Sequence, residues 1–212
     1  MSSRAEEIVF YTNPQSRGRI VRWMLEEVGQ PYRTEVLSFG EGMKSPEYLA
    51  INPMGKVPAI VHRGTVVTEG AAICSYLADA FPAAGLAPAL DDPRRGDYFR
   101  WLFFAAGPVE AAVSAKALGL LAPPDKAGTV GYGSFEQTVD ALEGAAASAS
   151  PWLLGEQFSA ADVYVGSQVL WGTLFKTLPV RDAFSAYGKR LQSRDAWQRA
   201  TALDDALIPP RG

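Results

Sequence analysis

Ser16 lies where a predicted first loop meets the start of a predicted helix. A serine there can be an N-cap whose hydroxyl accepts from a first-turn amide. Alternatively, its hydroxyl donates to an anion bound at the helix N-terminus. If that anion is a ligand thiolate, lowering its pKa from about 8.5 to about 6.5 requires roughly 2.7 kcal/mol. A hydrogen bond to a charged group supplies about 1.5–3 kcal/mol and the helix dipole about 0.3–1 kcal/mol. One serine at one helix end is therefore sufficient.

Glu69 and Gly70 lie where a predicted hairpin becomes a helix. The amides of a first helical turn form an anion site, and the Glu69 carboxylate is placed to hold a cation. Together they suit the ammonium and carboxylate of an amino acid; the alternative is a glutamate that serves only the helix dipole. Lys44 and Lys56 flank the same hairpin and could receive a second carboxylate, although each taken singly is more often a solvated surface lysine.

The hairpin itself consists of two apolar, β-branched runs, residues 57–62 and 65–68, around a turn dipeptide. Pro58 interrupts the first run, and proline cannot donate to a strand ladder, so it must lie at a strand start, an edge or a bulge. If its peptide bond is cis, the chain turns at Val57 and leaves the N–H and C=O of that residue unpaired. These two groups are what an extended peptide ligand needs for antiparallel hydrogen bonds.

The segments around these residues alternate between strand and helix patterns. Residues 8–11 and 32–36 read as strands, residues 20–28 have helical spacing, and a second helical stripe follows Gly70 to residue 80. With the hairpin, they predict the order β-α-β-loop-β-β-α over about eighty residues.

Beyond the segment 83–93, which is rich in Ala, Pro and Gly, the sequence predicts only helices. We therefore expect a domain at 1–82, a linker at 83–93 and an all-helical domain at 94–212. The first helix of that domain covers 94–116, with a kink at Pro108. Further helices are expected at about 134–147, 159–175, 180–192 and 195–203.

Composition narrows the class of protein. The 212 residues are 48% hydrophobic and 20% charged, which suits one or two globular domains. The net charge of -3 and the dispersed basic residues argue against a nucleic-acid partner. One histidine and one cysteine, Cys74, provide no metal-ligand spacing and no disulfide framework. No apolar run is long enough to span a bilayer, and the N-terminus lacks signal-peptide features, so we expect a cytoplasmic protein without a metal.

Several of these features together resemble the cytosolic glutathione transferases, in particular bacterial members with a theta-, phi- or beta-like N-terminal motif. The resemblance extends over essentially the whole chain. It rests on residues 55–59 (Gly-Lys-Val-Pro-Ala), residues 68–73 (Thr-Glu-Gly-Ala-Ala-Ile), the serine in the first loop, the helical second part, and residues 159–162 (Ser-Ala-Ala-Asp). The last is a capping box with Asp in place of Glu, which we interpret as structural.

The resemblance implies a thioredoxin-like N-terminal domain, β-α-β-α-β-β-α, that binds glutathione as co-substrate, followed by the all-helical domain. It implies that Pro58 is cis and that Val57 pairs its backbone with the cysteinyl unit. Glu69 and the Gly70 amide would hold the γ-glutamyl end. By the same resemblance, Lys44 and Lys56 would receive the glycyl carboxylate, and Ser16 would stabilise the thiolate. A homodimer is also implied.

Two departures leave alternatives open. Most members of the family have Ser or Thr where this chain has Gly70, so one hydrogen bond to the γ-glutamyl carboxylate is missing, which would weaken binding up to roughly tenfold. Tyr11 lies on the first predicted strand, near the position from which other classes of the family use a catalytic tyrosine, and Arg17 follows Ser16 as a possible second donor. Asn13 or water remain further alternatives.

The expected activity is conjugation of the glutathione thiolate to small hydrophobic electrophiles. Trp101, Phe104 and Trp171 are candidates for the electrophile site, although aromatic residues at helical spacing are more often core. The alternatives are a non-catalytic carrier of glutathione or hydrophobic ligands, and a glutathione-dependent isomerase or peroxidase. A thiol-disulfide oxidoreductase is disfavoured because the first loop has no cysteine. We expect Cys74 to be buried and inert, and His62 to be an exposed residue at a strand end.

Overall fold

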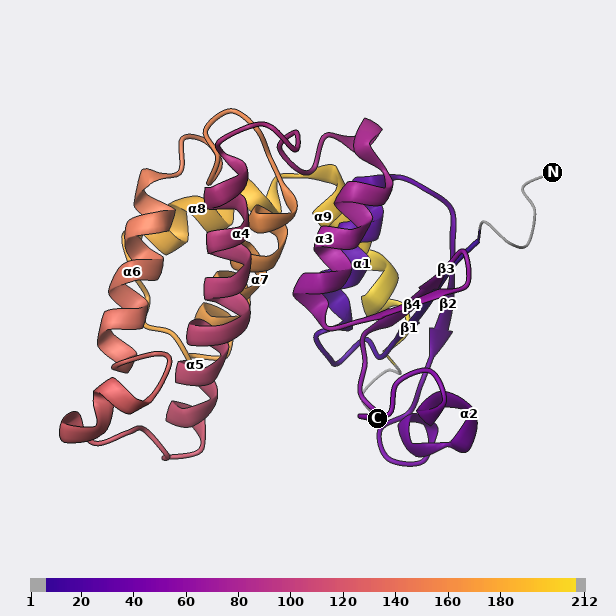
Figure 1. Cartoon of the computed structure of the whole chain (residues 1–212), viewed down its shortest axis with the longest axis horizontal. Helices are drawn as coiled ribbons and strands as arrows, with labels where there is room; N and C mark the ends of the chain where they lie inside the picture. Colours follow the sequence, from indigo (N-terminus) through magenta and orange to yellow (C-terminus); the bar gives the residue numbers. More distant parts are fainter. Residues whose placement is uncertain (1–6, 209–212) are drawn as a thin grey trace. The chain divides into compact units, whose positions relative to one another are not determined.

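The computed structural model describes residues 7–208, which form two compact units (Figure 1). The first unit contains the described residues up to Ala84 together with those from Asp195 onward. The second unit is Gly85–Arg194. We describe each unit by itself.

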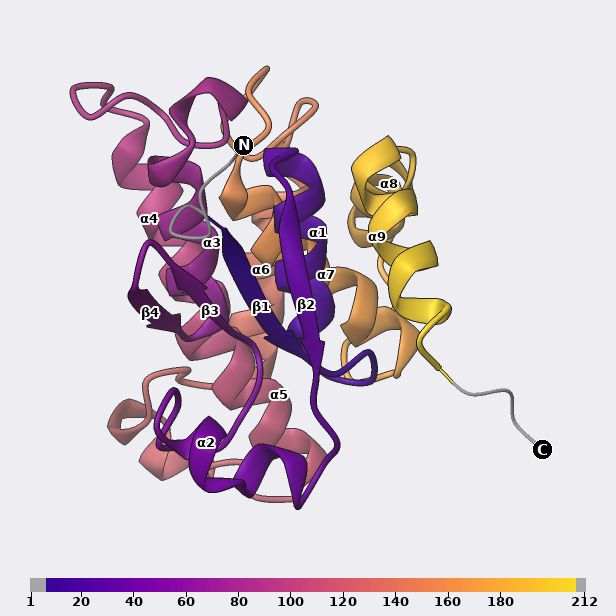
Figure 2. The ribbon, with the colours of Figure 1, turned by 90° about the vertical axis from the view of Figure 1, so that its right-hand side faces the viewer.

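The first unit is built on a mixed four-stranded sheet. Its strands are β1 (Ile8–Thr12), β2 (Tyr32–Val36), β3 (Ala59–His62) and β4 (Thr65–Thr68), in the spatial order β2-β1-β3-β4. β1 runs parallel to β2 and antiparallel to β3, and β3 is antiparallel to β4 (Figure 2).

Two helices cover one face of this sheet, α1 (Gly18–Val28) and α3 (Gly70–Ala80) (Figure 2). α1 turns its apolar stripe inward and ends at Gly29, whose φ of 70° suits a glycine. The short helix α2 (Pro46–Leu49) follows a 3-10 turn at Gly42–Lys44. The order β-α-β-α-β-β-α is therefore confirmed, and the first unit is thioredoxin-like.

Helix α9 (Asp195–Asp205) belongs to the first unit, whereas the sequence predicts it as part of the all-helical domain 94–212. It packs beside α1 (Figure 1). Arg22 Nε, on α1, donates a 3.1 Å hydrogen bond to Asp204 Oδ1 on α9. Both side chains are buried, so neither charge can be separated from its partner without a large desolvation cost. A contact across more than 180 residues leaves no local pattern in the sequence.

The second unit contains only helices as regular elements in the described residues: α4 (Arg95–Phe104), α5 (Glu110–Ala117), α6 (Phe135–Ser148), α7 (Ala160–Leu174) and α8 (Asp182–Gln192), with a 3-10 turn at Pro124–Thr129. α4 and α5 are separated by a π-helical turn, Ala105–Val109, which contains Pro108. The interruption predicted at this proline is thus present, since proline cannot provide the helical hydrogen bond.

The N-terminus of α7 is the polar centre of this unit. Asp162 accepts hydrogen bonds from the Ser159 N–H (3.0 Å), the Leu153 N–H (2.9 Å) and the Tyr187 hydroxyl (2.9 Å). Burial raises the pKa of Asp162 to about 6, although these donors oppose the shift. The predicted capping box is present and structural. No helix within residues 7–208 is long and apolar enough to cross a membrane.

Candidate functional site

The strand register brings the predicted site residues of the first unit to one end of the sheet. Tyr11 on β1 pairs with Ala59 on β3, and Ala59 pairs with Thr68 on β4. The Ser16 loop leaves β1 just after Tyr11, Val57 and Pro58 immediately precede Ala59, and Glu69 and Gly70 immediately follow Thr68. The Ser16 loop, the Val57–Pro58 segment and the start of α3 therefore meet at this end of the sheet.

The Val57–Pro58 peptide bond is cis, as the resemblance implied, and β3 begins directly after it. Within the described chain, no hydrogen bond joins the N–H or C=O of Val57 to another residue. The preceding carbonyl, that of Lys56, accepts from the Tyr48 hydroxyl (2.6 Å) and from Asn52 Nδ2 (2.7 Å). This pair of donors holds the Lys56–Val57 peptide in place and leaves the Val57 backbone available to a ligand.

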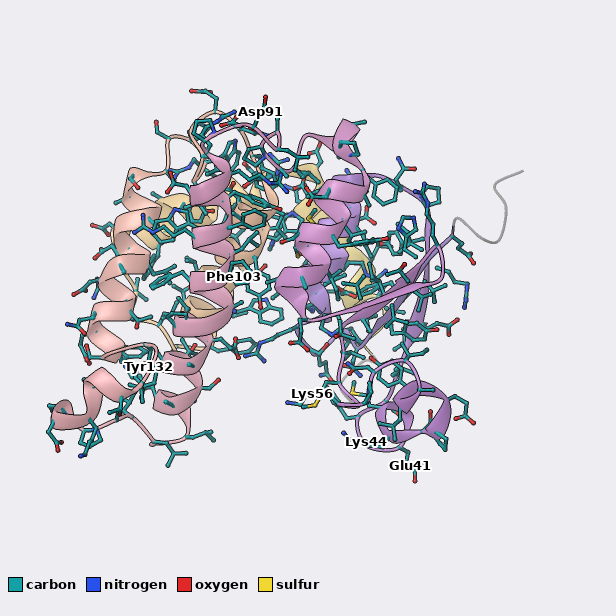
Figure 3. The ribbon with its side chains drawn as sticks, viewed as in Figure 1. Glu41, Lys44, Lys56, Asp91, Phe103 and Tyr132 are labelled. Atoms are coloured by element: carbon teal, nitrogen blue, oxygen red, sulfur yellow. The ribbon has the colours of Figure 1, made fainter. Side chains whose placement is uncertain are left out.

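Lys44 and Lys56 lie at the same end of the first unit, beside the segment that carries α2 (Figure 3). The ammonium of Lys44 donates to the Met54 carbonyl at 2.9 Å, and Lys56 is exposed. The side chain of Lys44 crosses Gly55 closely enough that a Cβ at residue 55 would lie 2.7 Å from Nζ and 2.6 Å from the Met43 carbonyl oxygen. Gly55 also has φ +57°, so both sterics and backbone conformation favour glycine there.

Glu69 adopts φ 65° and ψ 117°, a backbone conformation that a residue with a side chain rarely occupies. It is the N-cap of α3, makes no side-chain cap hydrogen bond, and is exposed. The first amides of an α-helix have no partner within the helix, so the N-terminus at Gly70 is suited to an anion while Glu69 is suited to a cation. Backbone strain of this kind is concentrated at ligand-binding sites.

Ser16 lies before α1 but is not its N-cap, a position that Arg17 occupies. The Ser16 hydroxyl donates a 2.7 Å hydrogen bond to the Asn13 carbonyl and accepts a 3.0 Å hydrogen bond from the Gly18 N–H. The Asn13 side chain ties the loop to the end of β2, because Nδ2 donates to the Leu37 carbonyl at 2.8 Å. The loop thus has a defined conformation without a ligand, and the hydroxyl must turn from Asn13 to donate to an anion.

The two alternative donors have different surroundings. Arg17 is exposed at the N-cap of α1. Tyr11 is half-buried, and its ring lies 5.5 Å from that of Tyr48, in the cluster to which Val57 also contributes. Tyr11 alternates with buried Phe10 and Thr12 along β1, so it faces away from α1.

The three aromatic candidates belong to the second unit. Trp101 and Phe104 lie on α4 with ring centroids 5.7 Å apart in an edge-to-face arrangement. Trp171 lies on α7, a helix that packs on α4. All three are half-buried. Phe103, which lies between Trp101 and Phe104 in the sequence, is 70% exposed. It is labelled on α4 in Figure 3.

Two residues noted in the sequence prove to be structural. Cys74 is buried, as predicted, and burial raises the pKa of its thiol, so the thiol is neutral and inert. His62 is 1% exposed, which corrects the expectation of an exposed strand end. Its Nδ1 lies 3.0 Å from the Tyr76 hydroxyl, because the α3 side of β3 is covered. Residues 7–208 contain no cluster of His, Cys, Asp or Glu suited to a metal ion.

Comparison with known proteins shows which families have similar sequences. The family model "Glutathione S-transferase, N-terminal domain" matches residues 16–80. Glutathione S-transferase GstA of Escherichia coli O157:H7 is 27% identical over 162 residues, 74% of this chain and 78% of that protein. The disulfide-bond oxidoreductase YfcG of Escherichia coli K12 is 28% identical over 207 residues, 91% of this chain and 94% of that protein.

Two solved glutathione transferase structures are similar to this chain over nearly its whole length. A glutathione transferase from Methylococcus capsulatus has a TM-score of 0.76 and 27% identity, covering 95% of this chain and all of that one (100%). A sphingomonad glutathione S-transferase solved with glutathione has a TM-score of 0.73 and 25% identity, with 93% and 98% coverage. The fold defines a protein with a thioredoxin-like unit and a helical unit. Residues 16–80 thus match the N-terminal domain of the glutathione S-transferases, and the chain as a whole has the glutathione S-transferase fold.

Proposed function

We propose that the protein binds glutathione at the end of the sheet where these segments meet, and that it conjugates the glutathione thiolate to small hydrophobic electrophiles. The observation that carries the proposal is the strand register, which brings the Ser16 loop, the unpaired Val57 backbone and the strained Glu69 to one end of the sheet. Each segment offers a different kind of group, and a tripeptide thiol has a matching group for each. Relatives of known structure that bind glutathione support this assignment.

The peptide part of the ligand is held by backbone and charge. The Val57 N–H and C=O take the cysteinyl unit as an added strand does, and Glu69 with the Gly70 amide takes the γ-glutamyl ammonium and carboxylate. The ammonium groups of Lys44 and Lys56 take the glycyl carboxylate. Because residue 70 is a glycine, only its amide is available there, and we expect moderate rather than tight affinity.

Ser16 supplies the hydrogen bond to the sulfur. Turning its hydroxyl away from Asn13 costs about 0.5–1.5 kcal/mol, against about 1.5–3 kcal/mol gained at a charged acceptor. The cost is at the low end because the Asn13 carbonyl retains a 3.1 Å hydrogen bond from the Ser16 N–H. The Gly18 N–H can still donate to the hydroxyl oxygen and polarise it. The net gain, with the helix dipole, favours the thiolate at neutral pH.

The electrophile requires an apolar surface, and Trp101, Phe104 and Trp171 are our candidates for it. In the reaction the thiolate attacks an electrophilic carbon, a carbon–sulfur bond forms, and the leaving group departs with its electron pair. The protein orients the reactants and stabilises the nucleophile. The homodimer that the family resemblance implies remains a prediction.

A second candidate is glutathione-dependent reduction of a disulfide, favoured by the near full-length similarity to YfcG. The chain's own thiol cannot take part, because Cys74 is buried and its pKa is raised. The nucleophile would therefore again be the glutathione thiolate at Ser16, attacking sulfur in place of carbon, with a second glutathione needed to release the product.

Calorimetry with glutathione and with S-methylglutathione tests the binding step. Rates of conjugation to a chloronitrobenzene and of reduction of a small dialkyl disulfide then test the chemistry. We expect both ligands to bind, and glutathione to be conjugated faster in the presence of the protein. Disulfide reduction without conjugation would select the second candidate. Binding with neither activity would indicate a carrier, and the absence of binding would refute the glutathione site.

A further inference from the structure

Arg19, in the first turn of α1, contacts the Ser16 loop at two points. Its N–H donates to the Ser16 carbonyl at 3.3 Å, and its Nε donates to the Pro14 carbonyl at 2.5 Å. The remaining end of the guanidinium points to α9, where Nη2 donates to Asp205 Oδ1 at 2.6 Å. The planar guanidinium fixes the relative positions of these partners, so Asp205 and the loop carbonyl are connected through one rigid group.

The position of Asp205 is unfavourable for α9 itself. It is the last residue of the helix and follows Asp204, and the last turn contains no basic residue. Negative charge at a helix C-terminus opposes the dipole. Asp204 is accounted for by its buried ion pair with Arg22. Asp205 is 59% exposed and pairs with Arg19, which offsets part of this unfavourable interaction.

We propose that Asp205 and Arg19 are positioning residues for Ser16, so that the C-terminal helix takes part in activating the thiol. Asp205 orients the Arg19 guanidinium, Arg19 holds the Pro14 carbonyl, and the loop keeps the Ser16 hydroxyl where the sulfur binds. The inference rests on the proposed function and deepens it, since it adds a helix more than 180 residues away to the thiolate site.

A purely electrostatic role for Asp205 and Arg19 predicts a change of the opposite sign in the pKa of the bound thiol when the carboxylate is removed. Asp205 neutralises part of the Arg19 charge, so removal of the carboxylate would leave a stronger cation near the loop and lower the pKa of a nearby thiol. Loss of positioning instead weakens the Ser16 hydrogen bond to the thiolate and raises the thiol pKa. The direction of the change therefore distinguishes the two roles.

The test compares Asp205→Asn and Arg19→Lys with a matched control, Arg199→Gln. Arg199 also joins α9 to α1, through a 3.1 Å contact to Glu26 Oε2 near the other end of α1. For the first two variants we expect kcat to fall by about threefold to tenfold, the apparent pKa of bound glutathione to rise, and the KM for glutathione to change little. Arg19→Lys retains the charge but loses the two-sided contact, so it should be impaired as well.

We expect the control, Arg199→Gln, to retain the wild-type kcat and thiol pKa. We expect Asp205→Glu, which keeps the carboxylate, to retain most of the activity lost in Asp205→Asn. A lowered thiol pKa in Asp205→Asn, or an equal loss in Arg199→Gln, would overturn the proposal.

Hydrogen exchange separates this inference from the proposed function. Without glutathione, the amides of Ser16 and Gly18 should exchange faster in Asp205→Asn than in the wild type, and at the wild-type rate in Arg199→Gln. If the wild-type protein holds no thiolate, the proposed function fails while this measurement still tests the loop contact. Unchanged exchange in Asp205→Asn would refute the positioning role.

Discussion

The hydroxyl of Tyr48 donates a 2.6 Å hydrogen bond to the carbonyl of Lys56, the residue before Val57. Asn52 donates to the same oxygen at 2.7 Å. Because one peptide unit contains both this carbonyl and the Val57 N–H, the two side chains determine where that N–H points. The backbone that we assign to the cysteinyl unit is therefore positioned by the segment at α2.

Tyr48→Phe should weaken glutathione binding several-fold and destabilise the fold by about 0.5–1.5 kcal/mol, since it removes one donor and retains the ring. Calorimetry and denaturant unfolding provide the measurements. Burial raises the pKa of Tyr48 to about 12, so the neutral hydroxyl is favoured in the folded protein. This contribution is complete below pH about 10 and is lost as the pH rises through about 12, so it should not vary between pH 5 and 9. Unchanged affinity in Tyr48→Phe would show that Asn52 alone positions Val57.

Gly55→Ala should destabilise the protein and weaken glutathione binding, because the new Cβ would displace Lys44 and meet the Met43 carbonyl at 2.6 Å. Gly64→Ala is the matched control. Gly64 also has positive φ, +77°, but no atom lies within 4 Å of the position that a Cβ would take there. We expect about 1 kcal/mol of destabilisation in the control and about 1–3 kcal/mol more in Gly55→Ala. Equal losses in the two variants would argue against the close approach of Lys44.

Gly18→Ala should reduce both stability and turnover. A Cβ at residue 18 would lie 1.9 Å from the hydroxyl oxygen of Thr12, a buried and β-branched side chain that has little room to move. Overpacking of this kind costs about 1–3 kcal/mol. The double variant Thr12→Ala with Gly18→Ala removes the obstructing hydroxyl and should recover part of the loss. If it recovers none, the start of α1 is set by something other than this contact.

The second unit should contribute its own pH dependence through Asp162. Its pKa is raised to about 6 in the folded protein, against about 3.9 in an unfolded chain, so the native state binds the proton more tightly. Its contribution to stability is therefore complete below pH about 3.9 and decreases as the pH rises through about 6. Unfolding free energies of the wild type and Asp162→Asn between these limits measure it. The difference between the two proteins should depend on pH, and a constant difference would contradict the assignment.

The sequence predicted the elements whose signals are local. The hairpin that follows Pro58, the apolar stripe of α1 and the capping box at Ser159 each depend on residues close in the chain, and all are present. Even the gathering of Ser16, Val57 and Glu69 could be anticipated, but only through the family resemblance.

What the sequence could not predict depends on long-range partners. In the sequence, α9 resembles any other surface helix, because its buried ion pair joins Asp204 to the distant Arg22. The sequence likewise predicts an exposed His62, because it does not show that Tyr76 and Phe81 cover the ring. The hydrogen bond from Tyr48 to Lys56 depends on the turn between them, so no pattern in the sequence indicates it. Arg19 had no signal, because its partners lie five residues before it on one side and more than 180 after it on the other.

Thiolate stabilisation by Ser16 can be measured through the ultraviolet absorbance of thiolate when glutathione is added to the protein between about pH 5 and pH 9, compared among the wild type, Ser16→Ala and Tyr11→Phe. We predict a thiolate signal in the wild type with a pKa about two units below that of free glutathione. The signal should persist in Tyr11→Phe and shift back toward the free value in Ser16→Ala, while calorimetry shows that glutathione still binds. A signal unaffected by Ser16→Ala, or absent from the wild type although glutathione binds, would contradict the account.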